Sequence, residues 1–183
     1  MRALLANIDG LTASAWRFVT GPFGKPEINP ELGRWQLSFN LSHTKGLVAC
    51  AVGLENDLGV DVEACDRIRD AVDIADRFFS PEEVALLRHV GAKQTRDTFL
   101  RIWTLKEAYI KATGQGLSCP LDSFAFELEP VRIRFRAGVA DNPDEWQFAQ
   151  WRPTSRHVIA VAVRARSRTP MRVIERAVEL GEI

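Results

Sequence analysis

The chain has 183 residues, of which 46% are hydrophobic and 26% are charged, and its 24 basic residues balance its 24 acidic ones. This composition is sufficient for a packed core and excludes a disordered chain. Zero net charge excludes a general attraction to nucleic acid or to an anionic membrane, so any site for an anion must be local. The length corresponds to one domain or two small lobes.

The cysteines and the apolar runs indicate a cytoplasmic protein. Three cysteines stand far apart with no C-x-x-C pair, which argues against a disulfide framework or a zinc site and favours a reducing compartment. No apolar run approaches the roughly 20 residues of a membrane span. The first residues also lack the basic-then-apolar pattern of a signal peptide. We therefore expect no contact with a membrane.

The beginning of the chain predicts a helix, a short strand and a constrained loop. Residues 2–7 continue a helix that ends near Gly10, and residues 15–19 have strand composition. The segment from Gly21 to Pro26 is rich in residues that break regular structure, so it predicts a turn. Lys25 lies in this turn, where it could face solvent or bind an anion.

A β-hairpin is predicted next. Residues 35–41 and 47–52 have strand composition and flank a turn at residues 42–46. This turn contains Ser42 and His43. A lone histidine in a turn is usually structural, whereas a serine, a histidine and a nearby lysine also suit a phosphate monoester.

The third predicted strand, residues 58–63, contains two acidic residues. Asp61 and Glu63 are two apart, so they point to the same face of a strand, with valines on the other face. Carboxylate oxygens, together with waters and substrate phosphates, are the ligands that Mg²⁺ prefers. Such a pair alone is usually a solvated edge. A metal site becomes the better interpretation if Glu107 approaches from a helix packed across this strand.

Two helices follow this strand. Ser80, Pro81 and Glu83 combine an N-cap, a first-turn proline and a capping box, so one helix begins there and runs to about residue 91. The second helix covers residues 94–112, and the glycines after it end it.

The second of these helices has charged residues within its apolar band. Trp103, Glu107 and Lys111 are spaced i, i+4, i+8, so they lie in one row along the helix. This spacing alone is typical of a salt bridge on a solvated edge. On a mostly buried helix it would instead indicate an active site with a metal ligand and a general acid.

The rest of the chain has mainly strand composition. No G-x-G-x-x-G, G-x-x-x-x-G-K-[ST] or G-x-S-x-G motif occurs, which argues against a Rossmann fold, a P-loop and an α/β-hydrolase. Strands and helices are interspersed without regular βαβ alternation, so the sequence predicts an α+β fold. The predicted strands cover residues 124–128, 131–135, 145–151 and 157–163, and a peripheral helix is predicted for residues 171–183.

Several of these motifs occur in an order that resembles a known family. The chain resembles a 4'-phosphopantetheinyl transferase of the surfactin-synthetase-activating type from about residue 16 to about residue 163. The pair G-V-D-V-E and W-T-L-K-E-A-Y-I-K at this separation is highly specific. The matching segments are Gly24-Lys25-Pro26, Asn40-Leu41-Ser42-His43, Gly59-Val60-Asp61-Val62-Glu63, Ser80-Pro81-Glu82-Glu83, Trp103-Thr104-Leu105-Lys106-Glu107-Ala108-Tyr109-Ile110-Lys111 and Gly114-Gln115-Gly116-Leu117-Ser118.

The resemblance implies two α+β lobes related by a pseudo-twofold axis, with the coenzyme A site between them. The first lobe would be residues 1–56 and the second, with the metal site, residues 57–183. Compared with the family, the first lobe is incomplete, since the chain starts inside what matches the last helix of a longer segment. The start codon could be misassigned, the sequence could be truncated, or the protein could be short. Only if the chain is complete do we expect weaker coenzyme A binding and an exposed sheet edge. A monomer is expected, with self-association as the alternative.

The resemblance also implies a reaction, in which the phosphopantetheine arm of coenzyme A moves to a serine of an acyl or peptidyl carrier protein. The products are the holo-carrier and 3',5'-ADP. The carrier could be of fatty-acid, polyketide, nonribosomal-peptide or lysine-pathway type. The resemblance makes Asp61, Glu63 and Glu107 the Mg²⁺ ligands, matches Lys25, Ser42 and His43 to the 3'-phosphoadenosine end of coenzyme A, and places Lys111 near the pyrophosphate.

Physical chemistry agrees with these roles. Mg²⁺ on the pyrophosphate would neutralise charge on the attacked phosphorus and on the leaving group. Lys111 can stabilise or protonate the leaving phosphate, and Glu107, or a metal-held water, can accept the proton of the carrier serine. Two other interpretations are a non-catalytic module that binds coenzyme A or a carrier, and a Mg²⁺-dependent pyrophosphate hydrolase. The candidates for a carrier groove are Ile68, Ile74, Phe78 and Phe79, of which the two phenylalanines are expected to be mostly core.

Overall fold

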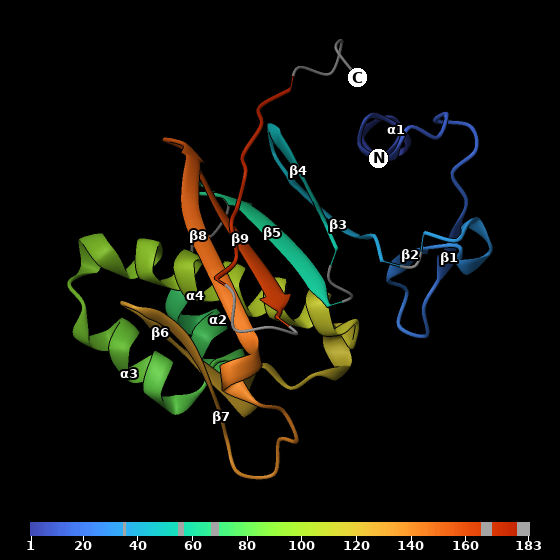
Figure 1. Cartoon of the computed structure of the whole chain (residues 1–183). Coiled ribbons are helices and arrows are strands. Elements are labelled where there is room, and N and C mark those ends of the chain that lie inside the picture. Colours follow the sequence, from blue (N-terminus) through green and yellow to red (C-terminus); the bar gives the residue numbers. More distant parts are fainter. Residues whose placement is uncertain (35, 55–56, 67–69, 166–169, 179–183) are drawn as a thin grey trace.

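A computed structural model describes residues 1–34, 36–54, 57–66, 70–165 and 170–178. Helices and antiparallel strand pairs are mixed along the chain, which confirms the α+β class (Figure 1). The helices are α1 (Arg2–Asp9), α2 (Ala71–Phe78), α3 (Pro81–His89) and α4 (Ala92–Thr113). The strands are β1 (Phe18–Thr20), β2 (Pro26–Ile28), β3 (Ser38–Thr44), β4 (Leu47–Gly53), β5 (Leu58–Ala64), β6 (Phe124–Leu128), β7 (Val131–Phe135), β8 (Trp146–Thr154) and β9 (His157–Arg164).

Helix α4 is the centre of the larger part of the molecule. One side of it packs against β5 and β9 of the three-stranded sheet β5-β9-β8. Helices α2 and α3 and the β6–β7 hairpin contact it as well (Figure 1). The apolar residues predicted to form a band on α4 are mostly buried between Phe99 and Ala112. They fill the contact of α4 with the sheet and its contact with the other helices and the hairpin. No helix in the described part of the chain is long and apolar enough to span a membrane.

Short-range signals predicted the helix ends well. Helix α1 ends at Gly10, whose φ of 79° is the left-handed conformation that glycine adopts readily. At the start of α3, Ser80 accepts a hydrogen bond from the Glu83 amide while the Glu83 carboxylate accepts one from the Ser80 amide. This is the predicted capping box.

The first hairpin differs from its prediction. Strand β3 runs to Thr44, and the turn is reduced to two residues, Lys45 and Gly46. Ser42 and His43 therefore lie on the strand, opposite Ala49 and Val48 of β4, and point to different faces. The prediction of a five-residue turn was wrong because turn-forming residue types were taken as local signals, whereas cross-strand pairing extends the strand.

The predicted helix at the end of the chain is also wrong where it can be judged. Residues 170–178 form neither helix nor strand, and residues 179–183 lie outside the described residues. Met171 packs against the apolar face of β5 and β9, and its amide donates to the Gln147 side chain. These contacts join the segment to the sheet, whereas a helix would depend on hydrogen bonds within the segment itself.

Strands β3 and β5 belong to different sheets but lie beside each other. Side chains of β3 join them: Asn40, Ser42 and Thr44 accept hydrogen bonds from the β5 amides of residues 60, 62 and 64, at 2.9, 3.3 and 3.3 Å. The separation is 20 residues in each case, so the two strands run parallel. We call these three residues the β3 ladder.

Gly59 allows α4 to approach β5 closely. A Cβ atom at this position would lie 2.0 Å from the Ala108 carbonyl oxygen and 2.5 Å from the Ala112 nitrogen. We expect Gly59→Ala to lower the free energy of unfolding by about 1–3 kcal/mol, since helix backbone would have to move. Urea unfolding measures this. Gly91→Ala is the control, because nothing lies within 4 Å of its Cβ position. Equal effects in the two variants would contradict the close-packing explanation.

Candidate active site

The acidic pair lies on the buried strand β5, with Asp61 and Glu63 only 3% and 5% exposed. Val60 and Val62 alternate with them and pack into an apolar cluster that includes Ile159. The strand period therefore turns both carboxylates away from this cluster, toward the side of the β3 ladder. The predicted pairing of the two carboxylates on one face is confirmed.

Lys111 meets this pair from α4. Its Nζ lies 2.6 Å from Asp61 Oδ1 and 3.0 Å from Ser42 Oγ, which itself donates to Asp61 Oδ1 at 2.9 Å. A carboxylate, an ammonium and a hydroxyl from three different elements thus form one cluster. Glu107 lies one helical turn before Lys111 on the same helix and is half-buried.

The other oxygen of Asp61 fits a metal ion. Oδ2 is buried and has no hydrogen-bond partner within the described residues. A buried carboxylate oxygen without a partner is costly, and a hard cation would compensate this cost. Among the residues that the structure describes, however, no three histidine, cysteine or acidic side chains are grouped closely enough to hold a metal ion. Glu107 as the third ligand therefore stays a prediction.

Lys25 lies away from this cluster, at the end of α4. Its Nζ donates to the carbonyl oxygens of Ala112, at 2.8 Å, and Leu58, at 3.2 Å. A cation is favourable at a helix C-terminus. Burial lowers the pKa of Lys25, and the charges of Asp57 and Glu27 partly oppose this effect.

Beside Lys25 is a cavity of about 290 Å³ between the first part of the chain and α4. Arg34, Asp57 and Thr113 also line it. His43 is exposed on β3, on the face opposite to Ser42. The structure therefore brings Asp61, Glu63, Ser42 and Lys111 together, and places Lys25 and His43 outside this group.

One buried charge was missed by the sequence interpretation. Lys106 is fully buried, and its Nζ lies 2.8 Å from Glu83 Oε2 and 2.6 Å from the carbonyl oxygens of Leu121 and Phe124. Burial lowers its pKa, and Glu83 opposes that shift. The signal was in the sequence: all four residues three or four positions from Lys106 are apolar, namely Ile102, Trp103, Tyr109 and Ile110.

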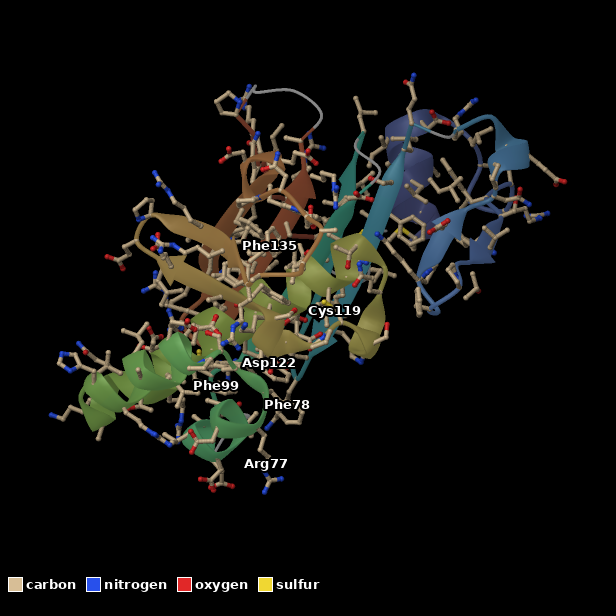
Figure 2. All side chains as sticks on the ribbon, turned by 90° about the horizontal axis from the view of Figure 1, so that it is seen from below. Arg77, Phe78, Phe99, Cys119, Asp122 and Phe135 are labelled. Atoms are coloured by element: carbon tan, nitrogen blue, oxygen red, sulfur yellow. The ribbon has the colours of Figure 1, made fainter. Side chains whose placement is uncertain are left out.

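The candidate residues for a carrier groove differ in how much of their side chains is exposed. Phe79 is buried and stacks on Phe99 at 4.9 Å, as expected for a core residue. Phe78 is 48% exposed, so its expected core position is wrong. Arg77 beside it extends away from the molecule (Figure 2). Ile68 lies outside the described residues.

Comparisons with known proteins identify the family of the chain. Residues 57–162 match the model of the 4'-phosphopantetheinyl transferase superfamily. The 4'-phosphopantetheinyl transferase HetI of Nostoc sp. is 33% identical over 163 residues, which are 89% of this chain and 67% of that protein. The 4'-phosphopantetheinyl transferase Sfp of Bacillus subtilis is 38% identical over 128 residues, which are 70% of this chain and 54% of that protein.

A solved structure, the holo-[acyl-carrier-protein] synthase of Thermotoga maritima, matches with a TM-score of 0.49 and 19% identity, over 61% of this chain and 64% of that chain. The chain spans between about half and two thirds of the length of the two curated relatives. The family model matches more than half of this chain, including the strand of the acidic pair and the whole of α4. The chain belongs to the 4'-phosphopantetheinyl transferase superfamily.

Proposed function

We propose that the protein transfers the 4'-phosphopantetheine arm of coenzyme A to a serine of an acyl or peptidyl carrier protein. The supporting observation is the cluster of Asp61 on β5 and Lys111 on α4, 2.6 Å apart, in a chain of this superfamily. Both residues lie on regular elements that are packed against each other. Groups held on such elements suit a reaction that depends on positioning and electrostatic stabilisation.

We further propose that Asp61, Glu63 and Glu107 hold Mg²⁺. Asp61 Oδ2, which has no hydrogen-bond partner in the described part of the chain, supports this, as does a donor set made only of carboxylate oxygens. When bound, Mg²⁺ would neutralise charge on the pyrophosphate of coenzyme A. Two or three carboxylates are sufficient, because Mg²⁺ usually keeps several waters and also binds substrate phosphates.

In the proposed reaction, Glu107 accepts the proton of the carrier serine. The serine oxygen then forms a bond to the phosphorus that bears pantetheine, and the bond from that phosphorus to the bridging oxygen breaks. Lys111 stabilises the phosphate of the leaving 3',5'-ADP or donates a proton to it. For this, its ammonium must share its hydrogen bonds between Asp61 and the substrate.

Lys25 and His43 are the proposed contacts for the 3'-phosphoadenosine end of coenzyme A. The cavity beside Lys25 and the exposure of His43 support this role. Ser42 lies at the acidic pair and is buried. The three cysteines are free thiols, which fits the cytoplasmic location that we propose.

The test is to incubate the protein with coenzyme A, Mg²⁺ and an apo-carrier, and to measure the intact mass of the carrier. We expect a gain of one phosphopantetheine arm, released 3',5'-ADP, and loss of both when Mg²⁺ is chelated. Bound coenzyme A with no mass gain would instead indicate a non-catalytic binding module. Coenzyme A cleavage without the carrier would indicate a pyrophosphate hydrolase.

A further inference from the structure

We infer that Ser42 and Thr44 are positioning residues, each of which fixes one carboxylate of the acidic pair through the β3 ladder. This inference rests on the proposed metal site and deepens it. Neither residue would touch substrate or metal. Each would act by holding Asp61 or Glu63 in the orientation that binds the ion.

The hydroxyl of Ser42 has no bonding capacity left for a substrate. It donates to Asp61 Oδ1 at 2.9 Å and accepts from the amide of Val62 at 3.3 Å and from Lys111 Nζ at 3.0 Å. A serine hydroxyl has one hydrogen and two lone pairs, so all three are used. The residue is also only 6% exposed. Its side chain therefore acts on Asp61 and not directly on the nucleotide.

Thr44 repeats this arrangement two residues further along β3. Its hydroxyl accepts from the amide of Ala64 at 3.3 Å and donates to Glu63 Oε2 at 3.5 Å. In both residues an amide of β5 occupies a lone pair of the hydroxyl oxygen. The hydroxyl hydrogen is thereby directed to the carboxylate that precedes this amide. The two amide contacts have the same length, but the contact of Thr44 with its carboxylate is longer than that of Ser42, at 3.5 Å against 2.9 Å. The effect of Thr44 should therefore be smaller than that of Ser42.

Asn40 is the third member of the β3 ladder and provides a matched control. Its side-chain oxygen accepts from the amide of Val60 at 2.9 Å, as the two hydroxyl groups do further along. The residue that precedes Val60 is Gly59, which has no side chain to orient. Loss of the Asn40 side chain therefore weakens the contact between β3 and β5 without affecting a carboxylate.

The experiment measures Mn²⁺ affinity by electron paramagnetic resonance, without coenzyme A or carrier, for Ser42→Ala, Thr44→Val and Asn40→Ala. Loss of a residue that orients a metal ligand typically weakens binding by about 10- to 100-fold, and we expect this for Ser42→Ala. Thr44→Val should weaken binding by less, and Thr44→Ser should restore it. Asn40→Ala should bind Mn²⁺ like the wild type, although all three substitutions should lower the melting temperature.

Several results would overturn the inference. If Ser42→Ala raises the KM for coenzyme A but leaves Mn²⁺ affinity unchanged, Ser42 is a nucleotide contact. If Asn40→Ala weakens Mn²⁺ binding as much as Ser42→Ala, the effect is general loosening of the contact between β3 and β5. A wild-type protein that binds no Mn²⁺ also refutes it. If Ser42→Ala does not fold, Thr44→Val and Thr44→Ser decide the question.

The Mn²⁺ measurement tests the positioning role separately from the proposed transfer reaction. Mn²⁺ binding needs neither coenzyme A nor a carrier, so it reports on positioning even if no carrier is modified. If transfer does occur, Ser42→Ala should raise the KM for Mg²⁺ more than it lowers kcat at saturating Mg²⁺. A purely structural role would not produce this split.

Discussion

Glu107→Gln should lower kcat for carrier modification by at least about 100-fold, the lower range for loss of a general base. Glutamine keeps the size of glutamate, but it cannot accept the proton of the carrier serine and is a weaker ligand for Mg²⁺. Glu107 is half-buried on helix α4, and glutamine has nearly the same shape, so the substitution should leave the fold intact. The rate of carrier mass gain at saturating coenzyme A and Mg²⁺ measures the effect.

The control for this variant is Glu175→Gln, since Glu175 is an exposed carboxylate in the segment after β9. It should keep the wild-type rate. Mn²⁺ affinity then separates the two roles of Glu107. Weaker Mn²⁺ binding in Glu107→Gln identifies a ligand, whereas unchanged binding with a lost rate identifies a base alone. Near-normal turnover would refute both roles.

Lys106→Met should lower the free energy of unfolding by about 3–5 kcal/mol, as is typical when one partner of a buried ion pair is removed. The variant would leave the Glu83 carboxylate, which is 2% exposed, without its cation, and would remove the hydrogen bonds that Lys106 donates to the carbonyl oxygens of Leu121 and Phe124. Glu83 would keep its hydrogen bonds from the amides of Ser80 and Phe126. These bonds do not compensate a buried negative charge. Urea unfolding measures the change.

An exposed ion pair provides the comparison. Arg88 Nη2 donates to both carboxylate oxygens of Asp76, but the two side chains are 62% and 38% exposed. Solvent screens such a pair, so Arg88→Met should cost at most about 1 kcal/mol. If Lys106→Met lowers the free energy of unfolding by as little as Arg88→Met does, then Glu83 is neutral when paired with Lys106 or finds another partner. The double variant Lys106→Met/Glu83→Gln should be less destabilised than the sum of its parts.

Features encoded within a few residues were predictable from the sequence. The capping box of Ser80 and Glu83 and the glycine stop after α1 depend only on neighbouring residues. The alternation that turns Asp61 and Glu63 to one face depends only on the strand period. These predictions are confirmed by the structure.

Features that depend on distant contacts were not predictable in this way. Asp61 and Lys111 are 50 residues apart, so their contact could not be derived from spacing. The family resemblance assigned both residues to one site but did not predict that they contact each other. The strand position of Ser42 depends on pairing with Ala49 of β4, and its place in the β3 ladder depends on Val62 of β5, 20 residues away. Neither contact can be derived from the residue types next to Ser42. Lys106 was passed over because a charged residue is buried only when a remote partner such as Glu83 is supplied by the fold.

The β3 ladder also determines which parts of the chain can exist separately. The family match begins at residue 57, which would be the obvious place to divide the protein. A fragment starting at Asp57 would lose the three side-chain acceptors for the amides of residues 60, 62 and 64, and the edge of β5 would be open to pairing with other molecules. The fragment that starts at Asp57 should therefore aggregate through this sheet edge. In the intact chain, the parts before and after residue 57 should unfold as one cooperative unit.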